Sequence, residues 1–530
     1  MKTPSKTTGK ARGGAKSENG KLHVDREGNL YNEYEVLTDE ELKWMNMVAV
    51  SPRMEDNKRA LEEQFGLNTS FDVKFREMTF GEKATGLLYL NGFAKDEVLT
   101  MIQMRLSMLD KGELVPRALA KLFEKYIPHI QVELVSTIPD AILKVMMGGS
   151  ALFIEGEEQA IVMDVKQYPV RSIEEPSLER VVRGSRDGFT ETLLTNVTLV
   201  RRRLRDPRLK FEVTMVGERS KTEVCIAYIN DIADLDLVEN VKDKIRKVKI
   251  DGIPLADKQL EEIIIGKNWN PYPQVRYSER PDVIASHLLE GHIVVFVDTS
   301  PSVMILPTTF FHLVQHAEEY RQTPFMGTYL RWVRFFGIFV SLFLLPAWLL
   351  FVMEPQLLPR SLDFIGPAEK ADIPLFGQIL VAEFGIDLMR LAAVHTPTPL
   401  ATAMGLIAAV LIGEIAVKVG LFVNEVILYI SLAALGMFAT PNYELSMANR
   451  VVRLLLLVAV ALFKAPGLIA GSTLVIILLA VQRSFHSPYL WPFIPFDAKA
   501  FFTLFIRIPT GRKLYRPSLL KTADSTRKPS

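Results

Sequence analysis

Cysteine is almost absent: Cys225 is the only one among 530 residues, so no disulfide can form within the chain. An excess of one charge is also missing, because the formal net charge is +1. A nucleic-acid-binding domain normally needs a strongly basic surface, so nucleic acid is not an expected partner. The chain has no phosphate-binding P-loop and no GxSxG, HExxH or CxxC motif. These absences predict a protein that is not an enzyme and holds no cofactor or metal.

Long apolar runs are missing before Gln322 but dominate from Tyr329 to Arg483. Charged residues make up 23% of the chain and apolar residues 48%, and it is their uneven distribution that is informative. It predicts an α/β or α+β soluble region of two subdomains, followed by an all-α multi-span membrane bundle. The expected parts are a disordered basic tail (1–30), an N-terminal soluble subdomain (31–150), a second α/β subdomain (151–325), the membrane bundle (326–485), an interfacial aromatic segment (486–510) and a basic cytoplasmic tail (511–530).

The first residues, MKTPSKTTGKARGGAKSENGK, are basic, small and polar, with no apolar core. They therefore do not form a signal peptide, and their composition predicts a disordered tail. Two interpretations of this tail stay open. It contacts anionic lipid, or it is solvated and has no role.

Helical and strand periodicities alternate in the soluble region, and the subdomains are expected to meet near residues 150–170. Residues 55–125 are expected to form several helices. Later helices are expected at Thr190–Leu204, Asp231–Val248 and Asp282–Glu290. The expected strands are Ser150–Glu155, Gln159–Val165, Phe211–Val216, Glu223–Ile229, His292–Asp298 and Val303–Leu306.

Two groups in the soluble region have ligand-binding or pairing potential. His312 and His316 lie four residues apart on an expected helix, but without a third ligand they are interpreted as surface or packing histidines. A dense charged segment follows residue 170, and it could bind an anion or form salt bridges. Salt bridges, within the chain or between subunits, are the favoured interpretation for Glu174, Glu175, Glu179, Arg183 and Arg186.

The C-terminal part is predicted to cross the membrane an even number of times, because its basic tail and the arginines Arg331 and Arg334 indicate cytoplasmic ends. The loop Pro441–Arg453 is expected to be cytoplasmic because it contains two arginines. Leu454–Val481 is interrupted near Lys464, so it is either one broken helix or a re-entrant hairpin. The other expected membrane segments are Phe335–Met353, Leu375–Val394, Ala401–Phe422 and Val426–Thr440.

Charged residues within these segments are the candidate functional residues, since they are costly in lipid. Glu383, Asp387 and Arg390 project from one stripe of a helix and are predicted to line a pore. The alternative is an interfacial helix, or an Asp387–Arg390 salt bridge in a closed bundle. Glu414 and Lys418 are predicted to form an i, i+4 ion pair.

Several motifs resemble the bacterial spore-germination GerA receptor A-subunit family over roughly residues 130–510. The membrane part, represented by GEIAVKVGLFVNEVILYISLAALGMFATPNYELS, is most similar to the sporulation-protein branch of that family, whereas nutrient-receptor members tend to have an uncharged version of this helix. The soluble motifs are SIEEPSLERVVRGSRDGFTETLLTNVTLVRRR (Ser172–Arg203), SERPDV (Ser278–Val283) and LLEGHIVVFVDTSPSVMILP (Leu288–Pro307).

The resemblance implies a spore inner-membrane protein that acts in germination. It implies a ring homo-oligomer, a pentamer, that passes monovalent cations, and a companion germination membrane protein. The alternative is a non-conducting scaffold or signalling subunit that docks other germination proteins. The soluble region and both termini are expected on the cytoplasmic side.

Overall fold

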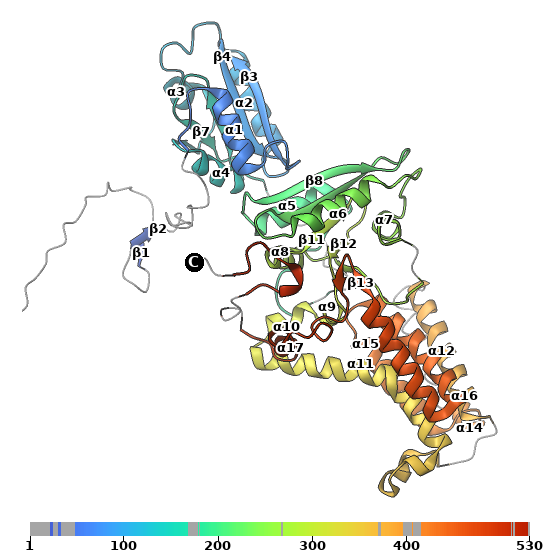
Figure 1. Ribbon diagram of the computed structural model, residues 1–530. Helices are drawn as coiled ribbons and strands as arrows, with labels where there is room; N and C mark the ends of the chain where they lie inside the picture. The colour runs from blue at the N-terminus through green and yellow to red at the C-terminus, as the bar shows by residue number, and fades with distance from the viewer. Residues whose placement is uncertain are drawn as a thin grey trace, which may run out of the picture.

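The computed structural model describes residues 22–24, 30–32, 48–167, 179, 181–266, 269–368, 373–395, 405, 415–509, 511 and 515–527. Figure 1 shows two sheet-containing units followed by a bundle of helices, with the first unit farthest from the bundle. The C-terminal segment returns from the bundle to the second unit. Near the N-terminus, the short strands β1 (Leu22–Val24) and β2 (Leu30–Asn32) pair antiparallel.

The first unit is a five-stranded antiparallel sheet with helices packed on it. Its strand order is β3-β4-β6-β7-β5, and apolar clusters lie on both faces. The predicted hairpin at 150–165 is confirmed as β6 and β7, which belong to this sheet. The first unit therefore extends to residue 163, which lies beyond the boundary expected at residue 150 and inside the expected meeting region of 150–170. The elements are α1 (Met54–Phe65), β3 (Val73–Phe80), β4 (Lys83–Leu90), α2 (Asp96–Ser107), α3 (Ala118–Lys121), η1 (Leu122–Tyr126), β5 (Val132–Val135), α4 (Ile138–Met146), β6 (Ser150–Ile154) and β7 (Ala160–Met163).

Several helices were expected in 55–125, and α1, α2 and α3 lie there, but the expectation missed β3 and β4, which pair over their full length. Apolar side chains in β3 do not alternate strictly, because Phe75 and Met78 are three residues apart. This weakens the period-two signal of an edge strand. The overlooked signal is the turn: Gly81 and Glu82 have φ values of 51° and 70°, as a two-residue hairpin turn of mirror-image type requires.

The second unit is another five-stranded antiparallel sheet, in the order β10-β12-β11-β9-β8. The predicted strands and helices of this unit are confirmed, with ends shifted by a few residues. Both units therefore have a mixed helix-and-strand fold with antiparallel sheets. The elements are α5 (Leu193–Arg203), β8 (Leu209–Val216), β9 (Thr222–Ile229), α6 (Leu235–Arg246), α7 (Ala256–Ile265), β10 (Arg276–Ser278), α8 (Pro281–Glu290), β11 (Ile293–Val297) and β12 (Val303–Leu306).

The two units are joined through the segment before β3. The Phe71 amide donates to the Phe211 carbonyl at 2.9 Å, and the Phe211 amide donates to Ser70 Oγ at 3.0 Å. Arg201 of α5 reaches the same segment, with Nε 2.9 Å from Asp72 Oδ2. Arg201 and Asp72 are 1% and 2% exposed, so a buried ion pair connects the units.

The bundle begins with α11, which starts earlier than the predicted Phe335, because Thr323 caps a helix whose first residue is Pro324. Among the described residues, α11 and α16 are long and apolar enough to cross a membrane, and α15 is a shorter apolar helix. Of the predicted segment 401–422, only the part from residue 415 and residue 405 are described. The elements are α9 (Phe310–Val314), α10 (Ala317–Arg321), α11 (Pro324–Met353), η2 (Pro355–Leu357), η3 (Arg360–Ile365), α12 (Leu375–His395), α14 (Ala416–Lys418), α15 (Asn424–Phe438) and α16 (Tyr443–Val481).

Helix α16 folds back on itself at Lys464, where φ is 53° and ψ is −131°. A methyl group added at Gly467 would lie 2.1 Å from the Ala459 carbonyl oxygen, a contact that a continuous helix could not make. Leu479 near its end packs in one cluster with Leu445 near its start. The hairpin interpretation of this segment is therefore the one that the structure supports.

The expected loop at 441–453 is wrong, because α16 starts at Tyr443 with Asn442 as its N-cap. Its two arginines were interpreted as a mark of a solvated loop. They lie instead on the buried side of the first arm of α16, and Arg450 and Arg453 are each 2% exposed.

The aromatic segment after α16 packs against the base of the bundle. The rings of Phe493 and Phe311 stack at 4.8 Å between centroids, and those of Phe505 and Phe335 lie 5.3 Å apart. Farther on, the Arg516 side chain donates to the Leu289 carbonyl at the end of α8. The end of the chain is thus attached to the second unit. The elements are β13 (Arg483–Ser484), β14 (Ser487–Pro488), α17 (Ala498–Phe505) and η6 (Ser518–Leu520).

Candidate functional site: a buried charge cluster in the helical bundle

Four charged side chains meet between α12 and the first arm of α16. Glu383 Oε1 lies 2.8 Å from Arg453 Nη2, and Glu383 Oε2 lies 3.3 Å from Arg450 Nη2. Arg450 also pairs with Asp387. Two acids and two arginines balance one another, so the cluster is formally neutral. Ion pairing of this kind lets charge be kept inside an apolar bundle, although Arg450 Nε and Arg453 Nε have no hydrogen-bond partner among the described residues.

Backbone carbonyl groups complete the cluster. Arg450 Nη2 donates to the Glu383 carbonyl at 2.6 Å, and Arg453 Nη1 donates to the Ser341 carbonyl at 2.6 Å. Ser341 belongs to α11, so three helices converge on the cluster. Because Glu383 is 1% exposed, its charge is shielded from solvent within one chain.

The three residues predicted to line a pore have different surroundings. Glu383 is buried, whereas 41% of the Asp387 side chain is exposed. Arg390 does not share the cluster: its Nη1 lies 2.7 Å from the Met447 sulfur and its Nη2 3.1 Å from the Met437 sulfur. The ion-pair partner of Asp387 is Arg450, not the Arg390 of the closed-bundle alternative. The pore-lining role of the three stays a prediction.

The ion-pair partners of Glu383 were not predicted from the sequence. Arg450 and Arg453 follow it by 67 and 70 residues. The available signal was the distribution of charge over two apolar segments. One segment contains the acids Glu383 and Asp387 and the other contains Arg450 and Arg453, so the two could form ion pairs. The predicted Glu414–Lys418 ion pair involves Glu414, which lies outside the described residues.

A second buried group connects the soluble part to α11. Glu319 of α10 is fully buried and pairs with Arg331, whose Nε lies 2.7 Å from Glu319 Oε2, and with Arg334. Arg331 also donates to the carbonyls of Thr503 and Leu504 in α17 at 2.8 and 2.9 Å. Arg331 and Arg334 were expected to mark a cytoplasmic end. In the structure Arg331 joins α10, α11 and α17, and Arg334 joins α10 to α11.

The charged segment of the soluble region is only partly described, and Glu174 and Glu175 lie outside the described residues. Glu179 accepts a hydrogen bond from Ser278 and lies 3.7 Å from Arg276 Nη2, so its expected pairing with Arg183 or Arg186 is wrong. Those two arginines are exposed. Glu179 instead attaches the segment to β10.

Asp187, in the same segment, has a lowered pKa. Burial alone would raise the pKa of this carboxyl, but hydrogen bonds from Ser185 and Arg203 outweigh burial and hold it below its usual value. Arg203 Nη2 lies 2.5 Å from Asp187 Oδ2. The described part of the segment thus contains the salt bridge Asp187–Arg203, which was not predicted, and the role of the five predicted residues stays a prediction.

His312 and His316 do not share a helix. His312 lies on α9, whereas His316 is the N-cap of α10 and accepts a hydrogen bond from the Glu318 amide at 3.2 Å. Burial lowers the pKa of His316 to about 4, so its ring is neutral near pH 7. The packing interpretation fits His316. His312 has two other histidines as neighbours, which sequence spacing did not reveal.

One buried ion pair joins the two antiparallel-sheet units, and a second buried group joins α10 to the long apolar helix α11. These features define the class: a protein with a mixed helix-and-strand region attached to an apolar helical bundle. Within that class, the chain belongs to the Bacillus/Clostridium GerA spore germination protein family, whose model matches residues 59–519. The resemblance found in the sequence is thereby confirmed.

Three relatives from Bacillus subtilis show where the similarity lies. Stage V sporulation protein AF is 49% identical over 474 residues, which cover 89% of this chain and 96% of that protein. The uncharacterized membrane protein YfkQ is 30% identical over 88% of this chain and 91% of its own length. Spore germination protein KA is 28% identical over 91% of this chain and 89% of its own length. The higher identity to a sporulation protein confirms the predicted similarity to that branch.

The chain also matches a solved structure. It is the crystal structure of the N-terminal domain of the A subunit of the Bacillus megaterium spore germinant receptor GerK3, at 26% identity. The match covers 50% of this chain and 98% of that one, with a TM-score of 0.40.

Proposed function

We propose that this protein is the pore-forming subunit of a ring homo-oligomer, a pentamer, that conducts monovalent cations during spore germination. By this conductance it releases cations or amplifies a germination signal that has already begun. The observation that carries the proposal is the exposure of Asp387: a carboxylate 41% exposed on a bundle of apolar helices. Such a group is costly against lipid, so it should face water or a neighbouring copy.

The surface around Asp387 supports assembly. On α12, Val381, Phe384, Leu388 and Leu391 are between 51% and 64% exposed. These side chains form an apolar face that neighbouring copies would cover, with Asp387 at its margin. Asp387 is paired with Arg450 of its own chain, but its side chain stays partly exposed, so around a ring these carboxylates would form a girdle of acidic groups open to cations.

We also propose the location and topology. The protein lies in the spore inner membrane, with the soluble region and both termini in the spore core. Arg527 Nη2 lies 2.5 Å from Glu290 Oε1 in α8, a contact that supports a common side for residues 515–527 and the soluble region. The basic N-terminal tail contacts anionic lipid, and a second germination membrane protein is its companion.

A non-conducting scaffold is the second candidate, and one observation favours it. Glu383 is neutralised by Arg450 and Arg453 within one chain, so it offers no free charge to a pore. In this alternative the exposed face of α12 binds another germination protein, and the buried cluster serves only to hold the bundle.

Potassium release from vesicles separates the two candidates. We expect purified protein, reconstituted into potassium-loaded liposomes with anionic lipid, to release potassium well above protein-free vesicles. Oligomer size is measured on the same sample by light scattering. A ring-sized oligomer that releases no potassium would favour the scaffold, and a protein-dependent release that equally empties anion-loaded vesicles would contradict cation selectivity.

A further inference from the structure

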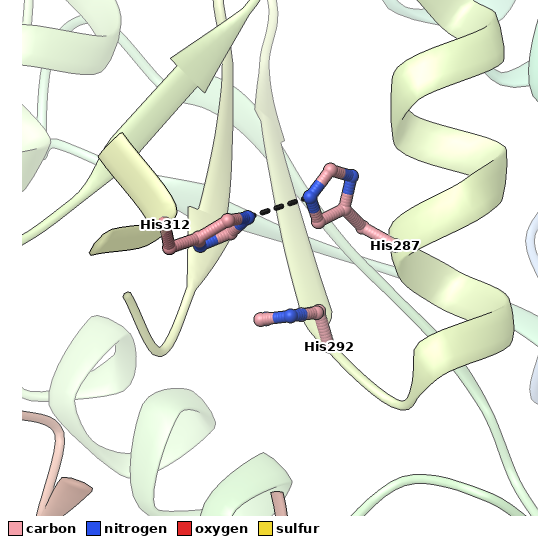
Figure 2. A group of neighbouring side chains, drawn as sticks. All are labelled: His287, His292 and His312. Atoms are coloured by element: carbon pink, nitrogen blue, oxygen red, sulfur yellow. Dashed lines mark hydrogen bonds between the residues drawn. The ribbon is translucent and has the colours of Figure 1, made fainter. Parts of the chain in front are cut away.

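Three histidines from three elements meet in the second soluble unit. His287 lies on α8, His292 directly before β11, and His312 on α9. One ring nitrogen of each lies within 4.8 Å of the others. Figure 2 shows the rings of His287 and His312 directed toward each other, with His292 beside them. The group lies away from the charge cluster of the bundle, and the inference drawn from it does not rest on the proposed conductance.

The rings of His287 and His312 are each oriented by an oxygen. His287 Nδ1 lies 2.7 Å from the Val283 carbonyl, which can only accept, so this nitrogen carries the proton. His287 Nε2 therefore accepts the hydrogen bond of 2.6 Å that joins it to His312 Nε2. On its other side, His312 Nδ1 lies 3.0 Å from Thr308 Oγ1. In metal-binding histidines one nitrogen is likewise oriented by an oxygen and the other binds the ion, so an ion between the two Nε2 atoms would replace the proton that they share.

His292 provides the second, independent observation. It is 5% exposed, and its Nδ1 has no hydrogen-bond partner within the described part of the chain. Leaving a buried polar atom without a partner is unfavourable, so a ligand bound at Nδ1 would remove that cost.

Burial, assisted by the charge of Arg276, lowers the pKa of His287 to about 3, and burial lowers that of His292 to about 4. The positive charge of Arg276 disfavours a metal cation nearby. The Glu179 carboxylate, which lies 3.7 Å from the Arg276 guanidinium, offsets that charge.

We propose that His287, His292 and His312 form a binding site for a divalent transition-metal ion of the zinc class. Three imidazole nitrogens suit Zn²⁺ and leave a fourth position for water. Bound at Zn–N distances of about 2.0–2.1 Å, the ion would replace the contact between His287 and His312. It would hold α9 against α8 and the sheet. Because α9 leads through α10 to α11, the ion would stabilise the joint between the soluble region and the bundle.

Metal binding by the full-length protein tests the site. Detergent-purified protein is stripped with chelator, then titrated with ZnCl₂ or with CoCl₂, whose visible absorption reports nitrogen coordination. We expect about one tightly bound ion per chain. His287→Gln, His292→Gln and His312→Gln should each weaken binding about tenfold or more. His316→Gln is the matched control, because it changes a neighbouring histidine outside the cluster and should bind like wild type.

A further variant keeps the test valid if a ligand variant does not fold. Thr308→Val retains all three ligands and removes only the oxygen beside His312 Nδ1. We expect it to fold and to bind the ion about tenfold more weakly. The proposal is overturned if wild type takes up no zinc or cobalt after stripping, or if His316→Gln loses as much binding as His292→Gln.

Discussion

Replacing Glu383 with glutamine should destabilise the helical bundle by about 3–5 kcal/mol, because it leaves Arg450 and Arg453 buried without their shared acid. Glutamine keeps the size of the side chain, so packing loss does not explain the effect. The expected result is a large fall in the thermal midpoint of unfolding of the detergent-purified protein, measured by size-exclusion chromatography of heated samples. The yield of folded protein should fall as well.

Two further variants make this prediction specific. Glu82→Gln is the matched control: Glu82 pairs with Lys111 at 2.8 Å, but their side chains are 61% and 86% exposed, so it should cost below about 1 kcal/mol. The double variant Glu383→Leu, Arg453→Leu should be less destabilised than the sum of its single variants. Additive effects would mean that the two side chains do not act as a pair.

Replacing Asp72 with asparagine should loosen the two soluble units from each other, at a cost of about 3–5 kcal/mol. Arg201 would keep its bonds to the carbonyls of Asp206 and Leu209, at 3.2 and 2.9 Å, but lose the carboxylate that neutralises it. Hydrogen exchange of full-length protein should show faster exchange at Phe71 and Phe211, whose backbone groups join the units.

Asp164→Asn provides the comparison, since Asp164 pairs with Lys166 in a partly exposed position at 2.8 Å. We expect no measurable change in exchange at the junction for this variant. Equal exchange at Phe71 in wild type and in Asp72→Asn would contradict the claim that the ion pair holds the units together.

Local patterns with clear boundaries were predictable from the sequence. The helix α8, its closing Gly291 and the strands β11 and β12 follow one another with short connections, and their apolar runs are continuous. Strands of this kind, buried on both faces, need no partner to be recognised. The edge strand β3 was missed because its apolar positions lack a single period, so only pairing with β4 defines it.

The candidate sites were less predictable because their members come from distant parts of the chain. Arg450 and Arg453 were assigned to a loop, since a charge beside an apolar run usually marks its end. Only the packing of α12 against α16 shows that Glu383 compensates them. The histidine cluster likewise combines spacings of five and twenty residues, which fit no short metal motif.

The reversal potential of the reconstituted protein in a planar bilayer tests the central claim most directly. Under a KCl gradient, the wild type should shift the potential toward the potassium equilibrium value. Asp387→Asn should form the same oligomer and shift it less, because the exposed carboxylate is removed. An unchanged potential in Asp387→Asn would show that this residue does not line the pore, and the absence of any conductance from wild-type oligomers would contradict the channel itself.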